Sequence, residues 1–134
     1  KIWVIGGLTT VDYPIELQKV FYSSDGTKWT EAGPLPIKLW GHSSVVFNNK
    51  MWVLGGSTKD NYGNALASRK VLYSSDGINW TEAGNNALPI GSYAHASVVF
   101  NNEIWVLGGQ TLTGGGFNLR KVSLVDGNGL TFGL

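Results

Sequence analysis

Two long segments of this chain occur twice, about fifty residues apart. Residues 20–33 and 71–84 are identical at 11 of 14 positions, and residues 42–56 and 95–109 are identical at 12 of 15. A shorter segment, in which an apolar run follows a charged residue and ends in two glycines, occurs three times. Self-similarity at this period predicts an array of supersecondary units that stack on one another, rather than one irregular domain.

Each period divides into short strands that are joined by tight turns. The asparagine pair 48–49 separates two apolar runs, and asparagine tolerates the left-handed backbone of a two-residue hairpin loop. The glycine pair 55–56 ends the second run, where glycine adopts unusual dihedral angles at little cost. The aspartate–glycine pair 76–77 turns the chain once more. The expected strands of this period cover residues 43–47, 51–54, 70–74 and a short stretch around Trp80.

Four antiparallel strands in each unit are typical of a propeller blade. The second strand, residues 51–54, is apolar on both faces, whereas a half-exposed strand would alternate between apolar and polar residues. Such a strand must be covered on both sides, as happens when blades stack. No segment has the 3.6-residue period of a helix, so we expect an all-β chain with three, four and up to four strands in successive units.

These residues resemble the kelch-repeat family of β-propellers, and the resemblance covers nearly the whole chain. A double glycine follows an apolar strand, a histidine opens the first strand of a unit, and a tyrosine and a tryptophan follow downstream. The resemblance implies blades whose first strand lines a central channel and whose fourth strand lies outermost. The matching positions are Gly6-Gly7, Gly55-Gly56, Gly108-Gly109, His42, His95, Tyr22 with Trp29, and Tyr73 with Trp80.

The repeats divide the chain into three expected blades. Residues 1–33 form a partial blade that lacks its innermost strand, residues 34–84 a complete blade, and residues 85–134 a third blade that is degenerate at its C-terminal end. In the third unit, serine and leucine at positions 123–124 replace the tyrosine region. Leu130 stands there in place of the tryptophan.

About three blades do not close a ring, because propellers of this family have about six or seven. Three explanations are open: a fragment of a longer chain, a homodimer that completes a ring of about six blades, or an incompletely observed chain. We favour the fragment, since tryptophan-rich faces of this size promote aggregation when they are exposed. The remaining blades, or a second copy, are then needed as partners to close the ring. The chain starts at Lys1 directly before a strand-like apolar run, so we expect it to have been processed, trimmed or only partly observed.

Composition excludes several kinds of function. The net charge is +1 without any run of Lys or Arg, which argues against nucleic acid as a partner. No apolar stretch approaches the roughly 18 residues of a membrane span. The chain has no Cys, so disulfides and thiolate metal sites are excluded, and we expect neither metal nor cofactor. Abundant Asn, Gly, Ser and Thr favour a secreted or cell-surface bacterial protein.

Strand direction separates the turns from the loops. The near-identical turns at 48–49 and 76–77 lie on one face of the expected propeller, and loops that differ between repeats lie on the other. Variable recognition is therefore expected on this second face. Its loops and connections are 8–18, 34–41, 57–69, 85–94 and 110–120. The candidate ligand-binding residues are Trp40, Tyr93, Asp12, Tyr13, Asp60, Tyr62, Arg69 and Arg120.

Two repeated pairs have alternative interpretations. Trp40 and Tyr93 each stand two residues before a repeated histidine, and an aromatic ring there either stacks on a ligand or packs against the neighbouring blade. We favour packing. His42 and His95 lack a third donor at metal-binding spacing, so we expect each to bind a backbone group.

These features favour a binding module without catalytic residues, whose variable loops recognise a protein or a glycan. The alternative is a propeller enzyme that acts on a sugar, with most of its active site on missing blades. Resemblance to the galactose oxidase type implies a Cys–Tyr cross-link, which this chain cannot form. Resemblance to sialic acid epimerases implies acid–base groups at the channel mouth. An adhesin or structural repeat of a surface assembly is a third possibility.

Overall fold

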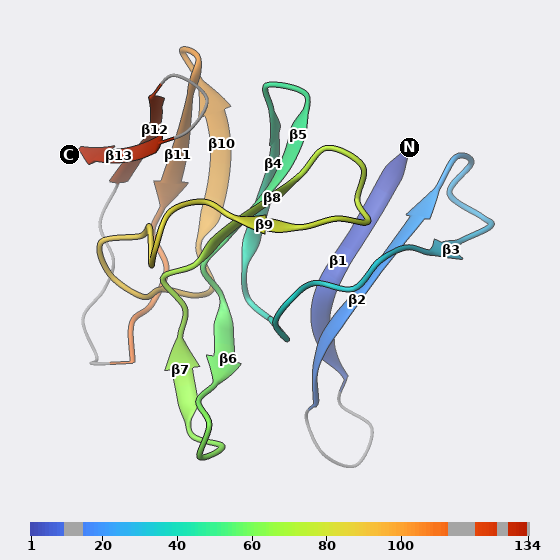
Figure 1. The fold of residues 1–134 in the computed structure, drawn as a ribbon, viewed down its shortest axis with the longest axis horizontal. Coiled ribbons are helices and arrows are strands. Elements are labelled where there is room, and N and C mark those ends of the chain that lie inside the picture. Colours follow the sequence, from blue (N-terminus) through green and yellow to red (C-terminus); the bar gives the residue numbers. More distant parts are fainter. Residues whose placement is uncertain (10–14, 113–119, 126–128, 134) are drawn as a thin grey trace.

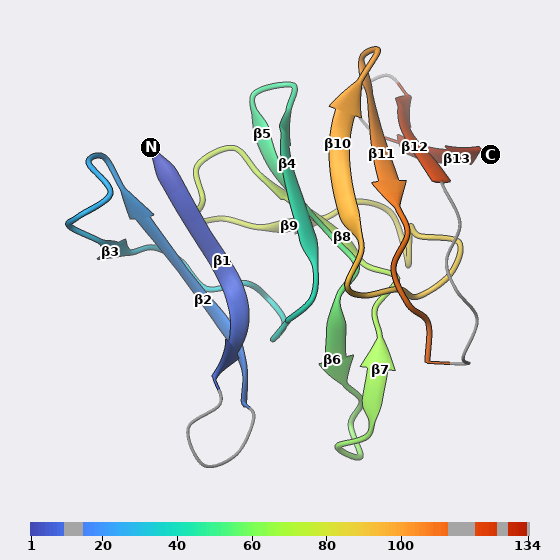
Figure 2. The ribbon, with the colours of Figure 1, turned by 180° about the vertical axis from the view of Figure 1, so that it is seen from behind.

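The computed structural model is an all-β chain of three fanned antiparallel sheets and one separate hairpin (Figures 1 and 2). It describes residues 1–9, 15–112, 120–125 and 129–133, and from residue 113 onward only the backbone. No helix occurs in these ranges. Blade 1 contains β1 (Ile2–Thr9), β2 (Ile15–Ser23) and β3 (Thr30–Glu31); blade 2 contains β4 (Ser43–Phe47), β5 (Lys50–Leu54), β8 (Val71–Ser74) and β9 (Thr81–Glu82); blade 3 contains β10 (Ala96–Phe100), β11 (Glu103–Leu107), β12 (Arg120–Val125) and β13 (Gly129–Gly133); the hairpin contains β6 (Ser57–Lys59) and β7 (Ala65–Ala67).

The three sheets follow one another around an open arc, and the innermost strands β4 and β10 are neighbours (Figure 2). Blade 1 has the order β1-β2-β3, so β1 is an edge strand that pairs with β2 and with no other strand of the described residues. Blades 2 and 3 have four strands each, in the orders β4-β5-β8-β9 and β10-β11-β12-β13. This arrangement confirms four-stranded antiparallel blades and an incomplete ring.

The hairpin turns have the backbone that the asparagines predict. Asn48 and Asn49 have φ of 48° and 55°, and the equivalent Asn101 and Asn102 have φ of 52° and 59°. Two consecutive residues in the left-handed region form the turn whose twist matches the flanking strands. The strands accordingly pair directly up to this turn in both β4–β5 and β10–β11.

The first glycine pair behaves differently from the other two. In blades 2 and 3 the glycines end the second strand, at positive φ, as expected. In blade 1, Gly6 and Gly7 lie inside β1, which continues to Thr9. The register shifts between Ile5 and Gly7, so this pair forms a bulge within a longer strand.

The serine–aspartate–glycine turns after β2 and β8 are held by side-chain hydrogen bonds. In blade 2, the hydroxyl of Ser74 accepts the N–H of Gly77 at 2.8 Å, and the carboxylate of Asp76 accepts two further backbone N–H groups at 2.8 Å. The hydrogen bonds to its carboxylate hold the pKa of Asp76 well below its usual range, and the bond from the N–H of Asn79 contributes most. The turn also touches blade 1, because a Cβ on Gly77 would collide with the ring of Trp3.

The hydrophobic core is divided between the two blade interfaces. Along β5 the side chains alternate: Val53 belongs to the cluster shared with blade 1, and Trp52 and Leu54 belong to the cluster shared with blade 3. All three are at most 5% exposed, so the strand is covered on both faces as predicted. The buried members of the first cluster are Val20, Leu35, Leu39, Val53 and Leu72; those of the second are Phe47, Trp52, Leu54, Val71, Ala83, Leu88, Ile104 and Val106.

Three details differ from or refine the expected strands. The segment 57–69, expected as a loop, contains the β6–β7 hairpin. The outermost strand β9 begins after Trp80 rather than around it. In blade 3 no single residue takes the place of Tyr73: Lys121 lies opposite Trp105 as Tyr73 lies opposite Trp52, whereas Ser123 pairs with Thr131 as Tyr73 pairs with Thr81.

Candidate binding face

The structure separates repeated turns from variable loops along the strands. The β4–β5 and β10–β11 turns lie at one end, and the β6–β7 hairpin projects from the other (Figure 1). We use "loop face" for the end that carries the β6–β7 hairpin together with the blade connections 34–41 and 85–94. Metal-binding groups of three or more His, Cys, Asp or Glu do not occur in the described ranges.

The β6–β7 hairpin closes around Asp60. Its carboxylate oxygen Oδ1 accepts the backbone N–H groups of Tyr62 and Asn64, both at 2.9 Å. The bond from Asn64 is the main reason why the pKa of Asp60 lies below its ordinary value. The predicted site residue Asp60 thus shapes the turn. Tyr62, at the tip, is 90% exposed, and Leu66 on β7 is 46% exposed.

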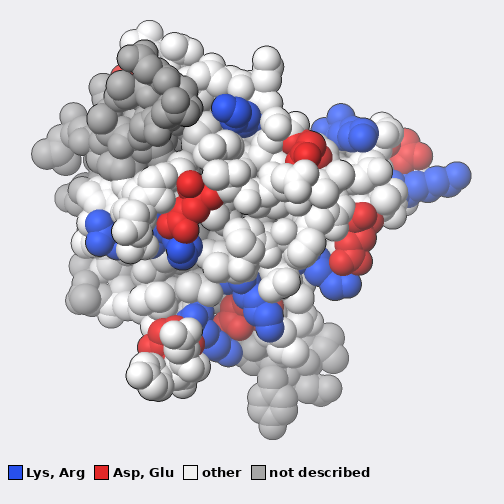
Figure 3. All heavy atoms as spheres, viewed as in Figure 1, with Lys and Arg blue, Asp and Glu red and all other residues white. Residues whose placement is uncertain are grey.

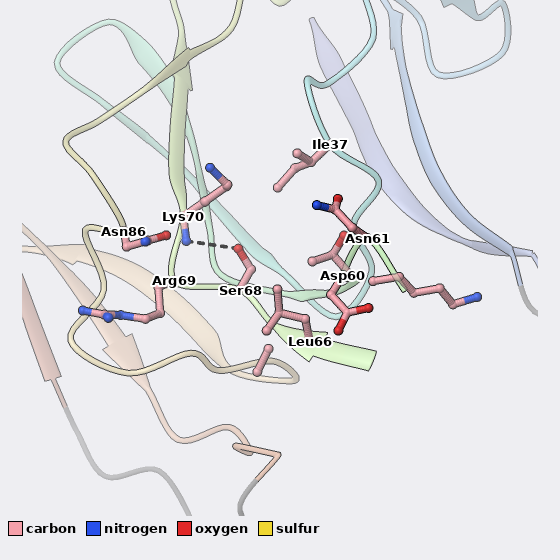
Figure 4. Close-up of a pocket in the computed structure, with 11 residues that line it drawn as sticks. Ile37, Asp60, Asn61, Leu66, Ser68, Arg69, Lys70 and Asn86 are labelled. Carbon is pink, nitrogen blue, oxygen red and sulfur yellow. Dashed lines mark hydrogen bonds between the residues drawn. The ribbon is translucent and has the colours of Figure 1, made fainter. Parts of the chain in front are cut away.

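A hollow of about 420 Å³ lies beside the hairpin (Figure 4). Ile37, from the connection between blades 1 and 2, and Asn86, from the next connection, lie on different sides of it, and Leu66 lies on the hairpin. A second hollow of about 520 Å³ shares Ile37, Thr58, Lys59 and Asp60 with the first. The hairpin therefore stands between two concave surfaces.

The charged groups around these hollows are mostly paired. Lys59 lies 3.4 Å from the carboxylate of Glu16, and Lys70 lies 2.7 Å from that of Glu82. The Nε–H of Arg69 donates to the carbonyl of Leu88 at 2.7 Å. Figure 3 shows acidic and basic side chains in mixed groups. The described acids of the loop face, Glu16 and Asp60, are both engaged, so they do not form a free carboxylate pair of the kind that glycoside cleavage requires.

Trp40 and Tyr93 lie together where two blade connections meet. Their ring centroids are 5.6 Å apart and their planes are tilted by 56°. Trp40 forms a backbone bridge with Ser57 and Tyr93 forms one with Gln110, so each ring residue is attached to the following glycine-pair segment. The predicted packing against the neighbouring blade is thus a contact between the two rings themselves.

His42 and His95 bind backbone carbonyl groups of the preceding blade, as predicted. The Nε2 of His95, which is 8% exposed, lies 2.9 Å from the carbonyl oxygen of Leu54. His42 binds the carbonyl of Ile5 in the same way, while its Nδ1 is buried without a partner among the described residues. Burial is the main cause that lowers the pKa of both imidazoles. Each histidine therefore joins two blades in its neutral form.

Acidification is expected to loosen these joints. Because the folded-state pKa of both histidines lies below the ordinary value of 6.5, the unfolded chain binds protons that the blades do not. The stability they contribute is complete above about pH 6.5 and decreases as the pH falls below it. Thermal denaturation between pH 7 and pH 5 should show a falling midpoint, and the fall should be smaller in His95→Gln, because a glutamine has no proton to gain.

The aspartates titrate at lower pH than the histidines, so the two contributions to the pH dependence can be told apart. The pKa values of Asp25, Asp60 and Asp76 are lowered by hydrogen bonds, so their contribution is lost only below about pH 4. An equal slope in wild type and His95→Gln between pH 7 and pH 5 would contradict the assignment to the imidazole.

The predicted candidates are distributed as follows. Trp40 and Tyr93 are in contact, Asp60 and Arg69 line one hollow, and Tyr62 lies at the hairpin tip. Asp12 and Tyr13 lie outside the described residues. Arg120 begins β12, and only its backbone is described. Of the residues that line the hollow, the sequence candidates included only Asp60 and Arg69. Ile37, Leu66 and Asn86 are among those missed, and only the apolar character of the first two in loop segments could have indicated them.

Comparison with known proteins finds relatives of this chain among kelch-repeat proteins. No family model matches the chain. Kelch repeat and BTB domain-containing protein 12 of Danio rerio is 30% identical over 116 residues, which cover 81% of this chain and 18% of that protein. Kelch-like protein 40 of Xenopus laevis is 31% identical over 115 residues, which cover 85% of this chain and 18% of that protein. The chain thus spans less than a fifth of these relatives.

Solved structures give the same answer for the fold. The structure of YjhT, a kelch propeller, superimposes on 98% of this chain with a TM-score of 0.74 at 19% sequence identity, and the match covers 42% of that protein. Within the described ranges, no helix is long and apolar enough to cross a membrane. With repeated glycine pairs, blade-joining histidines and four-stranded antiparallel sheets, the chain belongs to the kelch-repeat proteins and forms part of a β-propeller.

Proposed function

We propose that this chain is part of a protein-interaction propeller and that the loop face is its docking surface. One observation carries the proposal: the β6–β7 hairpin projects an aromatic and an aliphatic side chain, Tyr62 and Leu66, into solvent between two hollows. Exposed anchors of this kind beside concave surfaces are typical of protein interfaces. The kelch-repeat relatives support the same class of function.

The chemistry of the face favours a protein over catalysis. Glu16 is held in an ion pair with Lys59, and Asp60 accepts hydrogen bonds from its own turn, so these two acids beside the hollows are already engaged. The hollows carry apolar side chains, Ile37 and Leu66, that a partner can cover, and Lys59 and Lys70 beside them are already paired with carboxylates. The opposite face is built from turns that the repeats share, which gives it little means of distinguishing one partner from another.

A selection of phage-displayed random peptides on the full-length protein tests this proposal. Peptides retained by the wild type should lose at least about tenfold in apparent affinity on a Tyr62→Ser/Leu66→Ser variant, because both anchors are removed. The matched control is Ile78→Ser, since Ile78 is 57% exposed but lies in the turn after β8, on the other face.

The outcomes separate the candidate functions. Equal retention on the double variant, or loss on Ile78→Ser instead, would show that the hairpin is not the docking element. If no peptide is retained and a glycan array gives saturable binding, the partner is a glycan and the proposal is wrong. The variants should first be shown to unfold at the wild-type temperature, so that loss of binding reflects the surface.

A further inference from the structure

We propose that Trp40 and Tyr93 form a binding site for a proline-rich segment of the partner. This inference rests on the proposed function, because it names the kind of protein segment that the loop face takes. The two residues stand three positions before β4 and β10, the innermost strands of neighbouring blades. Their rings are 5.6 Å apart and half-buried, so they form one aromatic surface where the two strands begin.

The polar groups of the two rings can both donate, and no partner for them occurs among the described residues. Within the described ranges, neither the indole Nε1–H of Trp40 nor the hydroxyl of Tyr93 makes a hydrogen bond, and neither belongs to the fully buried polar atoms. Two other tryptophans differ: the buried Trp52 donates to the carbonyl of Phe47 at 2.9 Å, and the half-buried Trp105 donates to that of Phe100 at 3.2 Å. Half-buried aromatic rings whose donors have no partner are typical of recognition surfaces, because the ring is apolar while its polar group remains in contact with water.

The backbone of both ring residues is already occupied. Trp40 exchanges two hydrogen bonds with Ser57, at 3.1 and 2.7 Å, and Tyr93 exchanges two with Gln110, at 3.0 and 2.8 Å. A ligand therefore cannot add to these residues as a β-strand, and it must bind through the side chains. No Asp, Glu, Lys or Arg occurs in residues 39–44 or 90–97, so the ligand that fits this surface is uncharged.

A polyproline II segment matches these properties. Its pyrrolidine rings offer apolar surface to the aromatic rings, and its carbonyl groups stay free to accept hydrogen bonds because the helix has no internal ones. Proline has no N–H, so such a ligand needs donors and no acceptors, and this surface offers open donors. A sugar would also need acceptors for its hydroxyl protons, and the charged side chains that often supply them are missing from both ring segments.

Titration of the full-length protein, labelled with 15N at tryptophan, with a synthetic decaproline peptide tests this inference. We expect the indole N–H resonance of Trp40 to shift saturably, while those of Trp52 and Trp105 stay in place because their donors are occupied. Calorimetry should show that Trp40→Phe and Tyr93→Phe, which keep an aromatic ring but lose the donor, each weaken binding about 3-fold to 10-fold. Trp29→Phe is the matched control, since its ring is 43% exposed away from the site.

Three results would overturn the inference: no saturable binding of decaproline at about 1 mM, a shift confined to other tryptophans, or a saturable shift with cellohexaose in place of the peptide. Its failure can be told apart from failure of the proposed function. If decaproline does not bind but selected peptides still depend on Tyr62 and Leu66, the docking face stands and only the proline site is lost.

Discussion

Replacing Trp52 with alanine is expected to lower the free energy of unfolding by about 3–5 kcal/mol. The indole is 5% exposed, its Nε1–H donates to the carbonyl of Phe47 at 2.9 Å, and its ring lies 5.0 Å from that of Tyr73. Truncation therefore leaves a cavity between blades 2 and 3 and removes the donor from a buried carbonyl group. Urea denaturation of the full-length protein, followed by circular dichroism, measures the loss.

Trp29 provides the control for this prediction. It belongs to the turn region of blade 1 and is 43% exposed, so Trp29→Ala should cost less than about 1 kcal/mol. If the two variants lost similar amounts, β5 would not be the central strand of the core.

Gly55→Val is expected to be at least as damaging, and to abolish folding in a marginally stable background. Gly55 has φ of 59°, a region that a β-branched residue avoids, and a Cβ there would lie 2.6 Å from the carbonyl oxygen of Ser92 and 2.8 Å from the His95 ring. The backbone strain and the displacement of blade 3 should together exceed about 3 kcal/mol. The yield of soluble protein and the melting temperature give the measurement.

Two alanine variants separate strain from contact. Gly63 also has positive φ, 82°, but a Cβ there meets nothing within 4 Å, so Gly63→Ala should cost only the backbone strain of about 1–2 kcal/mol. Gly55→Ala should cost clearly more, because its Cβ meets the neighbouring blade. Equal losses would mean that the glycine is required only for its dihedral angles.

Much of the framework is predictable because it repeats. The asparagine pairs, the glycine pairs of blades 2 and 3 and the double-sided burial of β5 all follow from local chemistry that is present more than once in the sequence. The bulge in β1 is not predictable in this way. The first glycine pair has the same residues as the others, and the difference is that β1 continues to pair with β2 beyond it.

The loop face was harder to predict, for a physical reason. The hairpin β6–β7 consists of two three-residue strands, too short for a period of two to stand out. Its turn is closed by Asp60. The sequence suggests a free carboxylate at this position, but the carboxylate accepts hydrogen bonds from the backbone of its own turn. The contact between Trp40 and Tyr93 joins residues 53 positions apart in neighbouring blades, and repetition alone indicates that they are equivalent, not that they touch.

The division of the core between blade interfaces limits how such a chain can change. Val53 and Leu54 are adjacent in β5 but contribute to opposite clusters, so removing one whole unit would delete half of two cores at once. Duplication of a unit has the opposite effect, since every new interface would again pair like surfaces. Duplication of a unit therefore preserves the packing at every blade interface of this architecture. Substitutions cost little stability only in segments such as the β6–β7 hairpin that belong to neither cluster.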